Sequence, residues 1–324
     1  MASSRPFFEE HTVFIMDTFL SGRATLGIEM WLSLLERIEQ IDPQNYQNIH
    51  KGTAFYHAGI YSLFSNHFAD AYQWFEYSFE QDIKTGRIPD PGTSSLWILT
   101  FDSRENQSTK GNDYEYTKKI SCKVNQLLNQ IRVYDPSFNQ TENSLRGIIK
   151  SKIVTAQSER SLKSAWSSLL SSLLEYSEIE RFLKISPLAN EGQFKVTTFL
   201  VNLTLILETL IKKSPKASSI SLSNGQIGEI YEKIIAPNYG FTYDQSRCFL
   251  SSKTITKDYS KILLDINSAE SSEDRLAVSF TIAQRVRNSS HHIFNEEHIN
   301  LQVFSNISLR IYYAIFSVIE RLYV

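Results

Sequence analysis

Apolar residues recur at helical spacing along most of the chain. Between residues 25 and 40, four of them follow one another at intervals of four positions, which predicts an amphipathic helix with one buried face: Leu26, Met30, Leu34 and Ile38. The same spacing predicts further helices over residues 51–86 (a pair), 95–101, 114–133, 146–184, 194–213, 224–235, 273–287 and 301–323. Residues 95–101 also fit a short strand, but no neighbouring segment would pair with it. The pattern therefore predicts an all-α protein.

The helix pair within residues 51–86 resembles a single tetratricopeptide repeat. The residues that carry the resemblance are Gly59, Ala71, Phe75 and Ser78. Small side chains at the first two positions allow two helices to pack closely, while the aromatic ring fills the groove beside them. The closing proline of the repeat is absent and no second copy follows, so a long solenoid is not expected. A generic helical hairpin is the alternative interpretation.

Two helix-breaking residues, Pro187 and Gly192, mark the predicted domain boundary. We expect an N-terminal helical domain over residues 1–188 and a second helical domain over residues 189–324. In the second domain, four helical segments are predicted to form an antiparallel bundle around the most apolar of them. Residues 236–272 lack a regular pattern and receive no assignment.

Charge and cysteine content limit the classes of function. The chain has 33 basic and 35 acidic residues, a net charge of -2, so nothing in its overall charge attracts nucleic acid or anionic lipid. Any contact with nucleic acid must be local. Cys122 and Cys248 are the only cysteines and lie far apart in the sequence, which indicates neither a disulfide framework nor a zinc site.

The sequence shows no pattern typical of a leader or a membrane span. Glutamates occupy positions 9 and 10, where a signal peptide would be apolar. The most apolar stretch, residues 196–211, is interrupted by Asn202 and Glu208 and is too short to cross a bilayer comfortably. We therefore expect a cytoplasmic protein without a membrane partner.

A polar stretch follows the predicted helix over residues 273–287, where the chain reads RNSSHH from Arg287 to His292. It resembles the signature of the HEPN family (higher eukaryotes and prokaryotes nucleotide-binding domain). That signature is an arginine, often followed by a polar residue, and a histidine after four to six residues. Arg287, Asn288 and His292 match the four-residue form. The neighbouring His291 and the long segment over residues 236–272 depart from a minimal member.

The resemblance covers about residues 190–324 and implies a four-helix bundle with the motif at the end of its third helix. It also implies a metal-independent endoribonuclease acting in a toxin–antitoxin, phage-defence or RNA-processing system. Domains of this family typically dimerise with two motifs facing across one cleft. The N-terminal domain would then sense a signal or recruit a partner, and a protein or a nucleotide would regulate the activity.

The side chains suit that chemistry without reference to the family. Cleavage of RNA by its own 2′-hydroxyl needs a base and an acid, and histidine can serve in either role near neutral pH. The guanidinium of Arg287 is well shaped to stabilise the additional negative charge of the phosphorane. Asn288 would orient the phosphate or the histidine. The stretch has no carboxylate set that would hold a metal, and no cofactor is expected.

Helix geometry leaves the choice of histidine open. Arg287 and His292 would lie about 140° apart on an unbroken helix, whereas Arg287 and His291 would share a face. The family spacing favours His292 and helical geometry favours His291. Of the two, we favour His292. Either the helix ends between Arg287 and His292, or a second copy of the chain completes each site.

Two further observations concern RNA and assembly. A nuclease of this class needs a basic rim around its site, for which Arg285 and Arg310 are the candidates beside Arg287.

The predicted C-terminal helix is apolar on more than one face, which needs cover from the N-terminal domain or from a second copy. The family resemblance favours the second copy and hence a homodimer.

A non-catalytic interpretation stands beside the nuclease. An arginine and a histidine at a helix end are often structural, capping a carbonyl or pairing with an acid. The protein would then be a helical scaffold that binds a nucleotide or a protein partner.

Overall fold

The computed structural model of the protein describes residues 23–86, 93–103, 112–155, 159–186, 190–222, 227–240, 271–289 and 299–324. All regular elements within these residues are helices, which confirms the all-α class expected from the sequence. The chain forms two compact units, residues 1–121 and 122–324.

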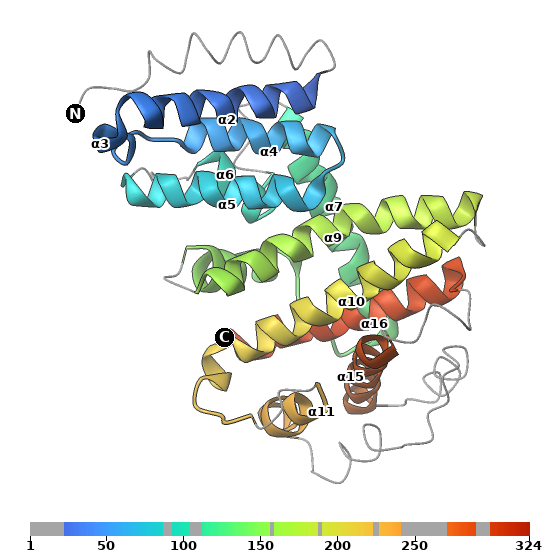
Figure 1. Cartoon of the computed structure of the whole chain (residues 1–324). Coiled ribbons are helices and arrows are strands. Elements are labelled where there is room, and N and C mark those ends of the chain that lie inside the picture. The colour runs from blue at the N-terminus through green and yellow to red at the C-terminus, as the bar shows by residue number, and fades with distance from the viewer. Residues whose placement is uncertain are drawn as a thin grey trace. The chain divides into compact units, whose positions relative to one another are not determined.

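The first unit contains helices predicted from the apolar pattern. Its elements are α2 (Ala24–Ile41), α3 (Pro43–Tyr46), α4 (Gly52–Phe64), α5 (Phe68–Lys84) and α6 (Ser94–Leu99), followed by the start of α7 (Asn112–Tyr134). Helix α4 packs between α2 and α5, and the three lie side by side (Figure 1). The predicted helical hairpin over residues 51–86 is confirmed. Within residues 95–101, the chain is helical up to Leu99 and does not form a strand.

The buried face of α2 lies one position further along the helix than predicted. Trp31 and Leu35 are 0% and 4% exposed, whereas Leu26 is 39% exposed. Trp31 and Leu35 pack with Ala54 and Tyr61 in one core cluster. The reason is the size of Trp31. Burial of the largest apolar side chain contributes most to stability, so α2 is rotated with the face that carries Trp31 toward α4.

Gly59 allows the close approach of α4 and α5. A Cβ atom at this position would lie 2.5 Å from the ring of Phe75, and Ala71 and Phe75 are fully buried. The residues that resemble the repeat therefore occupy the contact between the two helices.

The second unit is larger and holds the remaining elements. These are the rest of α7, α8 (Glu142–Ile149), the π-helix η1 (Lys150–Val154), α9 (Arg160–Ile185), α10 (Asn190–Lys212), the 3-10 turn η2 (Pro215–Ala217), α11 (Ile227–Ile230), the π-helix η3 (Tyr231–Ile235), α12 (Ala236–Tyr239), α15 (Ser272–Ser289) and α16 (Leu301–Leu322). The predicted helix over residues 146–184 is thus divided between α8 with η1 and α9. The segment predicted over residues 224–235 is short and partly π-helical.

The division between the units lies at residues 121 and 122, not at the expected boundary between 188 and 189. Helices α9 and α10 form an antiparallel hairpin that keeps them in one unit. At one end Gly192 packs directly against the ring of Phe182, and at the other Lys213 pairs with Glu159. Gly192 therefore lies within α10 at its contact with α9, and Pro187 lies outside the described residues. A connection within one unit and a linker between units have the same local sequence signals.

Four long helices build the core of this unit: α9, α10, α15 and α16. Helix α10 contacts the other three, as expected for the most apolar segment. The antiparallel arrangement predicted for α10 and α16 is wrong, because they run in the same direction. Gln193 Oε1 accepts from the Ile299 backbone N–H at 2.8 Å near their starts, and Tyr323 Oη donates to the Leu210 carbonyl at 2.6 Å near their ends. Figure 1 shows α10 and α16 side by side with α15 crossing them.

The apolar faces of α16 are covered within its own unit. Every residue from Arg310 to Ile319 is buried, and the helix contacts α8, α9, α10, α12 and α15. The apolar excess of this helix therefore needs no second copy of the chain, contrary to our expectation. The sequence argument missed this cover because it assigned α8 and α9 to another domain.

One stretch in the described part of the chain is long and apolar enough to cross a membrane. It is Gly192–Lys212 of α10, and 61% of its most apolar window is buried inside the protein. Its contacts with three helices identify it as a core helix of this unit.

Candidate functional site

Helix α15 carries the first part of the RNSSHH stretch. Ser271 caps its start: the Asp274 backbone N–H donates to Ser271 Oγ at 3.0 Å, and Ser271 Oγ donates to Asp274 Oδ2 at 2.6 Å. The apolar face of α15 is buried, with Phe280 and Ala283 both 0% exposed. This face fixes the rotation of the helix and hence the direction of Arg287 in its last turn.

Only part of the predicted motif lies within the described residues. Helix α15 continues through Asn288 to Ser289, so the backbone of Arg287 and Asn288 is helical. The side chain of Asn288 and both histidines, His291 and His292, lie outside the described residues. Their predicted roles stay predictions.

Arg287 forms an ion pair with a buried carboxylate of α10. Its Nη1 donates to Glu208 Oε1, and Lys212 Nζ donates to Glu208 Oε2 at 3.4 Å. Glu208 is 4% exposed, while the Arg287 side chain is 35% exposed. We refer to Glu208, Lys212 and Arg287 as the Glu208 cluster.

The charges of the Glu208 cluster hold the guanidinium group of Arg287 in one position. Burial raises the pKa of Glu208, and the charges of Arg287 and Lys212 oppose that shift. Burial outweighs those two charges, so the pKa of Glu208 lies above its usual range, while both pairings favour the anionic form. The cluster carries two positive charges and one negative charge, so a net positive charge remains. A charge-assisted hydrogen bond of this kind also holds the guanidinium in one orientation.

The two arginines predicted to form a basic rim do not share the position of Arg287. Arg285 is partly exposed, but two residues along a helix correspond to a rotation of about 200°, so it projects from nearly the opposite side. Arg310 is only 7% exposed, and its guanidinium carbon lies 3.3 Å from the ring centroid of Tyr134. Arg310 is therefore part of the interior and not of an exposed rim. Its position on α16, the most enclosed helix, is the reason.

Sequence reasoning noticed Glu208 only as an interruption of an apolar stretch. The signal for its role was present, because a single carboxylate in a buried helix requires a cationic partner. Lys212 at i+4 was visible as one such partner. Arg287 lies 79 positions away and became visible as the second partner only in the folded chain.

Metal-ligand geometry is missing from the part of the chain that the structure describes. No group of three or more His, Cys, Asp or Glu side chains there could hold a metal ion. The Glu208 cluster contains a single carboxylate whose oxygens both face cations. It therefore presents cationic donors, which suit an anionic ligand.

No protein-family model matches the chain, and no curated protein or solved structure matches it either. The assignment of function therefore rests on the residues and their geometry.

Proposed function

We propose that the protein is a metal-independent endoribonuclease whose C-terminal helices resemble a HEPN domain. The observation that carries the proposal is the Glu208 cluster. A buried carboxylate holds Arg287 at the end of α15, immediately before the histidine-rich stretch, and places Lys212 beside it. Catalysis of phosphoryl transfer requires a cation held in place before the charge develops.

The proposed mechanism divides the work between the cations and a histidine. His292 removes the proton from the 2′-hydroxyl of the RNA or protonates the departing 5′-oxygen, with His291 as the second candidate. Arg287 and Lys212 stabilise the phosphorane. Asn288 orients the phosphate or the histidine. The products are a 2′,3′-cyclic phosphate end and a 5′-hydroxyl end, and no metal takes part.

The proposed biological setting follows from the resemblance and not from the fold. It is a cytoplasmic toxin–antitoxin, phage-defence or RNA-processing system, in which the first unit senses a signal or recruits a partner. A protein or nucleotide regulator would restrain the cleavage of RNA, because an unrestrained endoribonuclease is toxic.

A second candidate function is supported by the same ion pair. Glu208 provides Arg287 with a carboxylate in the absence of any substrate, as in a structural pair that only ties α15 to α10. On this view the helices form a scaffold that binds a nucleotide or a protein partner without cleaving RNA.

The test is cleavage of single-stranded RNA by the purified protein in the presence of EDTA. We expect Arg287→Ala and His292→Ala each to lower the rate by about 100-fold or more, because each removes a group that acts in the transition state. The melting temperature of each variant checks that the fold is retained. Substitutions of exposed residues provide matched controls: the Arg181→Ala and His67→Ala proteins should cleave RNA at the wild-type rate.

The histidine pair is resolved in the same assay. His291→Ala should lower the rate less than His292→Ala, and the reverse order would assign the proton transfers to His291. Cleavage that requires magnesium, or that survives both Arg287→Ala and His292→Ala, would contradict the proposed mechanism. A folded protein that binds a nucleotide or partner but leaves RNA intact would favour the scaffold.

A further inference from the structure

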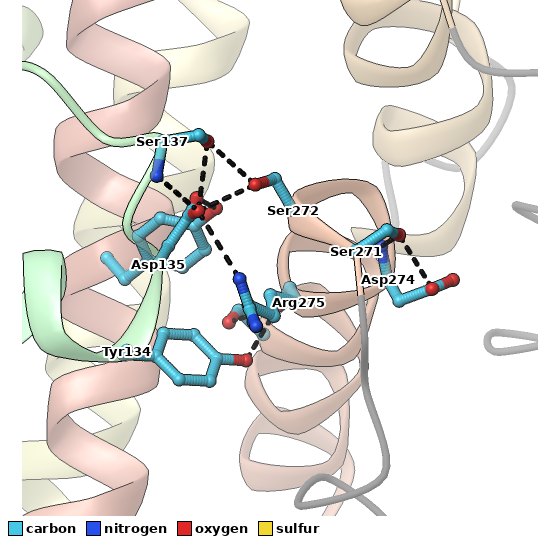
Figure 2. Close-up of polar contacts among 9 residues, drawn as sticks. Tyr134, Asp135, Ser137, Ser271, Ser272, Asp274 and Arg275 are labelled. Atoms are coloured by element: carbon cyan, nitrogen blue, oxygen red, sulfur yellow. Dashed lines mark hydrogen bonds and ion pairs between the residues drawn. The ribbon is translucent and has the colours of Figure 1, made fainter.

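A second polar cluster lies where the end of α7 meets the start of α15 and the middle of α16. Figure 2 shows its centre, the carboxylate of Asp135. Ser137 donates to Asp135 Oδ1 from its backbone N–H at 3.1 Å and from Oγ at 2.9 Å. Ser272 Oγ donates to the same oxygen at 2.6 Å, and Tyr313 Oη donates to Oδ2 at 2.6 Å.

Neutral donors therefore satisfy most of the hydrogen-bonding capacity of Asp135. Burial alone would raise the pKa of this carboxyl group, but the hydrogen bonds from Ser272, Tyr313 and Ser137 outweigh it and hold the pKa below its usual range. Asp135 is thus ionised without depending on an arginine.

Arg275 has only a loose partner in this cluster. Its Nη1 lies 3.6 Å from Asp135 Oδ1, which is within ion-pair range but beyond a hydrogen bond. Its backbone carbonyl accepts a hydrogen bond from Tyr134 Oη at 3.2 Å. Figure 2 shows the side chain of Arg275 between Asp135 and Tyr134, and the guanidinium carbon lies 5.8 Å from the Tyr134 ring centroid.

Arg310 is buried against the same ring, and no carboxylate among the described residues pairs with it. It is 7% exposed, and its guanidinium carbon is 3.3 Å from the Tyr134 ring centroid. Its Nε is buried without a hydrogen-bond partner, and no ion pair joins the guanidinium to any group in the described part of the chain. Burial lowers the pKa of Arg310, Tyr134 opposes this shift, and the nearby charge of Arg275 adds to it.

Among the described residues, the charges of this cluster do not balance. Two guanidinium groups lie against one tyrosine ring, and Asp135, which pairs loosely with Arg275, already accepts four hydrogen bonds from Ser137, Ser272 and Tyr313. A ring face compensates only part of the cost of burying a cation, and a buried cation normally has an anionic partner. An anion that completed the pairing would accept hydrogen bonds from two forked donors at once.

We propose that Arg275 and Arg310 bind the phosphate group of a small ligand. Phosphate offers several acceptor oxygens with the geometry that guanidinium groups recognise, whereas a carboxylate offers only two. The low exposure of Arg310 admits a free phosphate or a terminal phosphate and excludes the internal phosphates of an RNA strand. The ligand is therefore inorganic phosphate or a phosphomonoester such as a 5′-mononucleotide.

This phosphate site is separate from the Glu208 cluster. Arg275 lies in the first turn of α15 and Arg287 in its last, a separation of about 18 Å along a helix. The inference does not depend on the proposed ribonuclease activity. If both hold, occupation of the phosphate site would act on the rotation of α15, which carries Arg287.

The experiment measures the melting temperature of the full chain in millimolar phosphate, AMP, acetate or chloride at equal ionic strength. We expect phosphate or AMP, and neither acetate nor chloride, to raise the melting temperature by about 2–4 °C at roughly ten times the dissociation constant. A larger effect of AMP than of phosphate identifies a nucleotide as the source, and equal effects identify free phosphate. Equal shifts in all four salts would overturn the proposal.

The variants assign the effect to the site. Arg310→Met keeps the apolar stem and removes the charge, and it should abolish the phosphate shift. Arg275→Gln provides a milder change at a side chain that is 21% exposed, and should weaken phosphate binding at least 10-fold in calorimetric titration. Arg181→Met removes the same charge from an exposed position of α9 and should leave the shift unchanged. A shift retained by both site variants contradicts the proposal.

Discussion

A single buried carboxylate organises the candidate site at the scale of the residue. Glu208 lies within an apolar helix and accepts from Arg287 on another helix and from Lys212 one turn further on its own helix. Removing one partner of a buried pair leaves the other partner uncompensated, so the two cations depend on this carboxylate for their positions. Arg310 shows the opposite situation, because its charge is buried against a ring and pairs with no carboxylate among the described residues.

Glu208→Gln should therefore affect both activity and stability. The amide keeps the size of the side chain but loses its charge, so we expect the unfolding free energy to fall by about 1–3 kcal/mol. The RNA-cleavage rate should fall about 10- to 100-fold, mainly in kcat, because Arg287 is no longer held in position. Steady-state kinetics and urea unfolding measure the two effects.

The matched control is Glu180→Gln, which removes the carboxylate of the exposed pair with Lys184 at 3.1 Å on α9. This change should cost less than about 0.5 kcal/mol and leave the kinetics unaltered. If Glu208→Gln lowers stability but cleaves RNA at the full rate, Glu208 has a structural role only.

At the scale of the element, the close packing of two pairs of helices depends on one glycine in each pair. Gly59 lets α4 approach the ring of Phe75 on α5, and Gly192 lets α10 approach the ring of Phe182 on α9. Both contacts join helices that are adjacent in the sequence into hairpins, one in each unit. A methyl group at either position meets an aromatic ring, so the side-chain volume limits the distance between the helices.

Two glycine-to-alanine variants separate this packing effect from helix propensity. Gly59→Ala should lower the unfolding free energy of the first unit by about 1–2 kcal/mol, because the added Cβ would lie 2.5 Å from the Phe75 ring. Gly147→Ala in α8 has nothing within 4 Å of its added Cβ and should stabilise the second unit by about 0.5–1 kcal/mol. Denaturant unfolding followed by circular dichroism measures both. Stabilisation by Gly59→Ala would show that α4 and α5 separate without cost.

At the scale of the whole molecule, the second unit contains more of the chain than the sequence boundary predicted. Helices α8 and α9 belong with α10, α15 and α16, and together they bury the C-terminal helix completely through its middle. The burial of α16 removes the argument that an apolar face requires a second copy. The argument for a homodimer now rests on the family resemblance and on helix geometry. If the helix continued to His292, that histidine would lie about 140° from Arg287 and would have to reach an arginine of the other copy.

We predict a homodimer with sites shared between the two copies. Light scattering at micromolar concentration should give about twice the chain mass of 37.3 kDa. Mixing Arg287→Ala with His292→Ala protein should restore about one quarter of the wild-type activity, because half of the dimers are mixed and each has one intact site of two. A strictly monomeric protein, or a mixture as inactive as its components, would remove the shared site and favour the scaffold.

The sequence by itself determined the properties that depend on neighbouring residues. Helical periodicity predicted the all-α class, the hairpin of α4 and α5, and α10 as the central helix, because the spacing of apolar residues within a few turns decides which face is buried. The cap at the start of α15 likewise depends on two residues only three positions apart, Ser271 and Asp274. The arginine and the histidines of the candidate site were also read from local spacing.

Only the tertiary structure decided which distant groups meet. The pairing of Glu208 with Arg287 across 79 positions, the burial of Arg310 on Tyr134, and the parallel course of α10 and α16 have no local signal. A glycine such as Gly192 precedes a linker in one fold, whereas here it lies within α10 at the contact with α9. The physical reason is that apolar and charged side chains specify the kind of partner they need, whereas the packing of the whole core selects which partner is within reach.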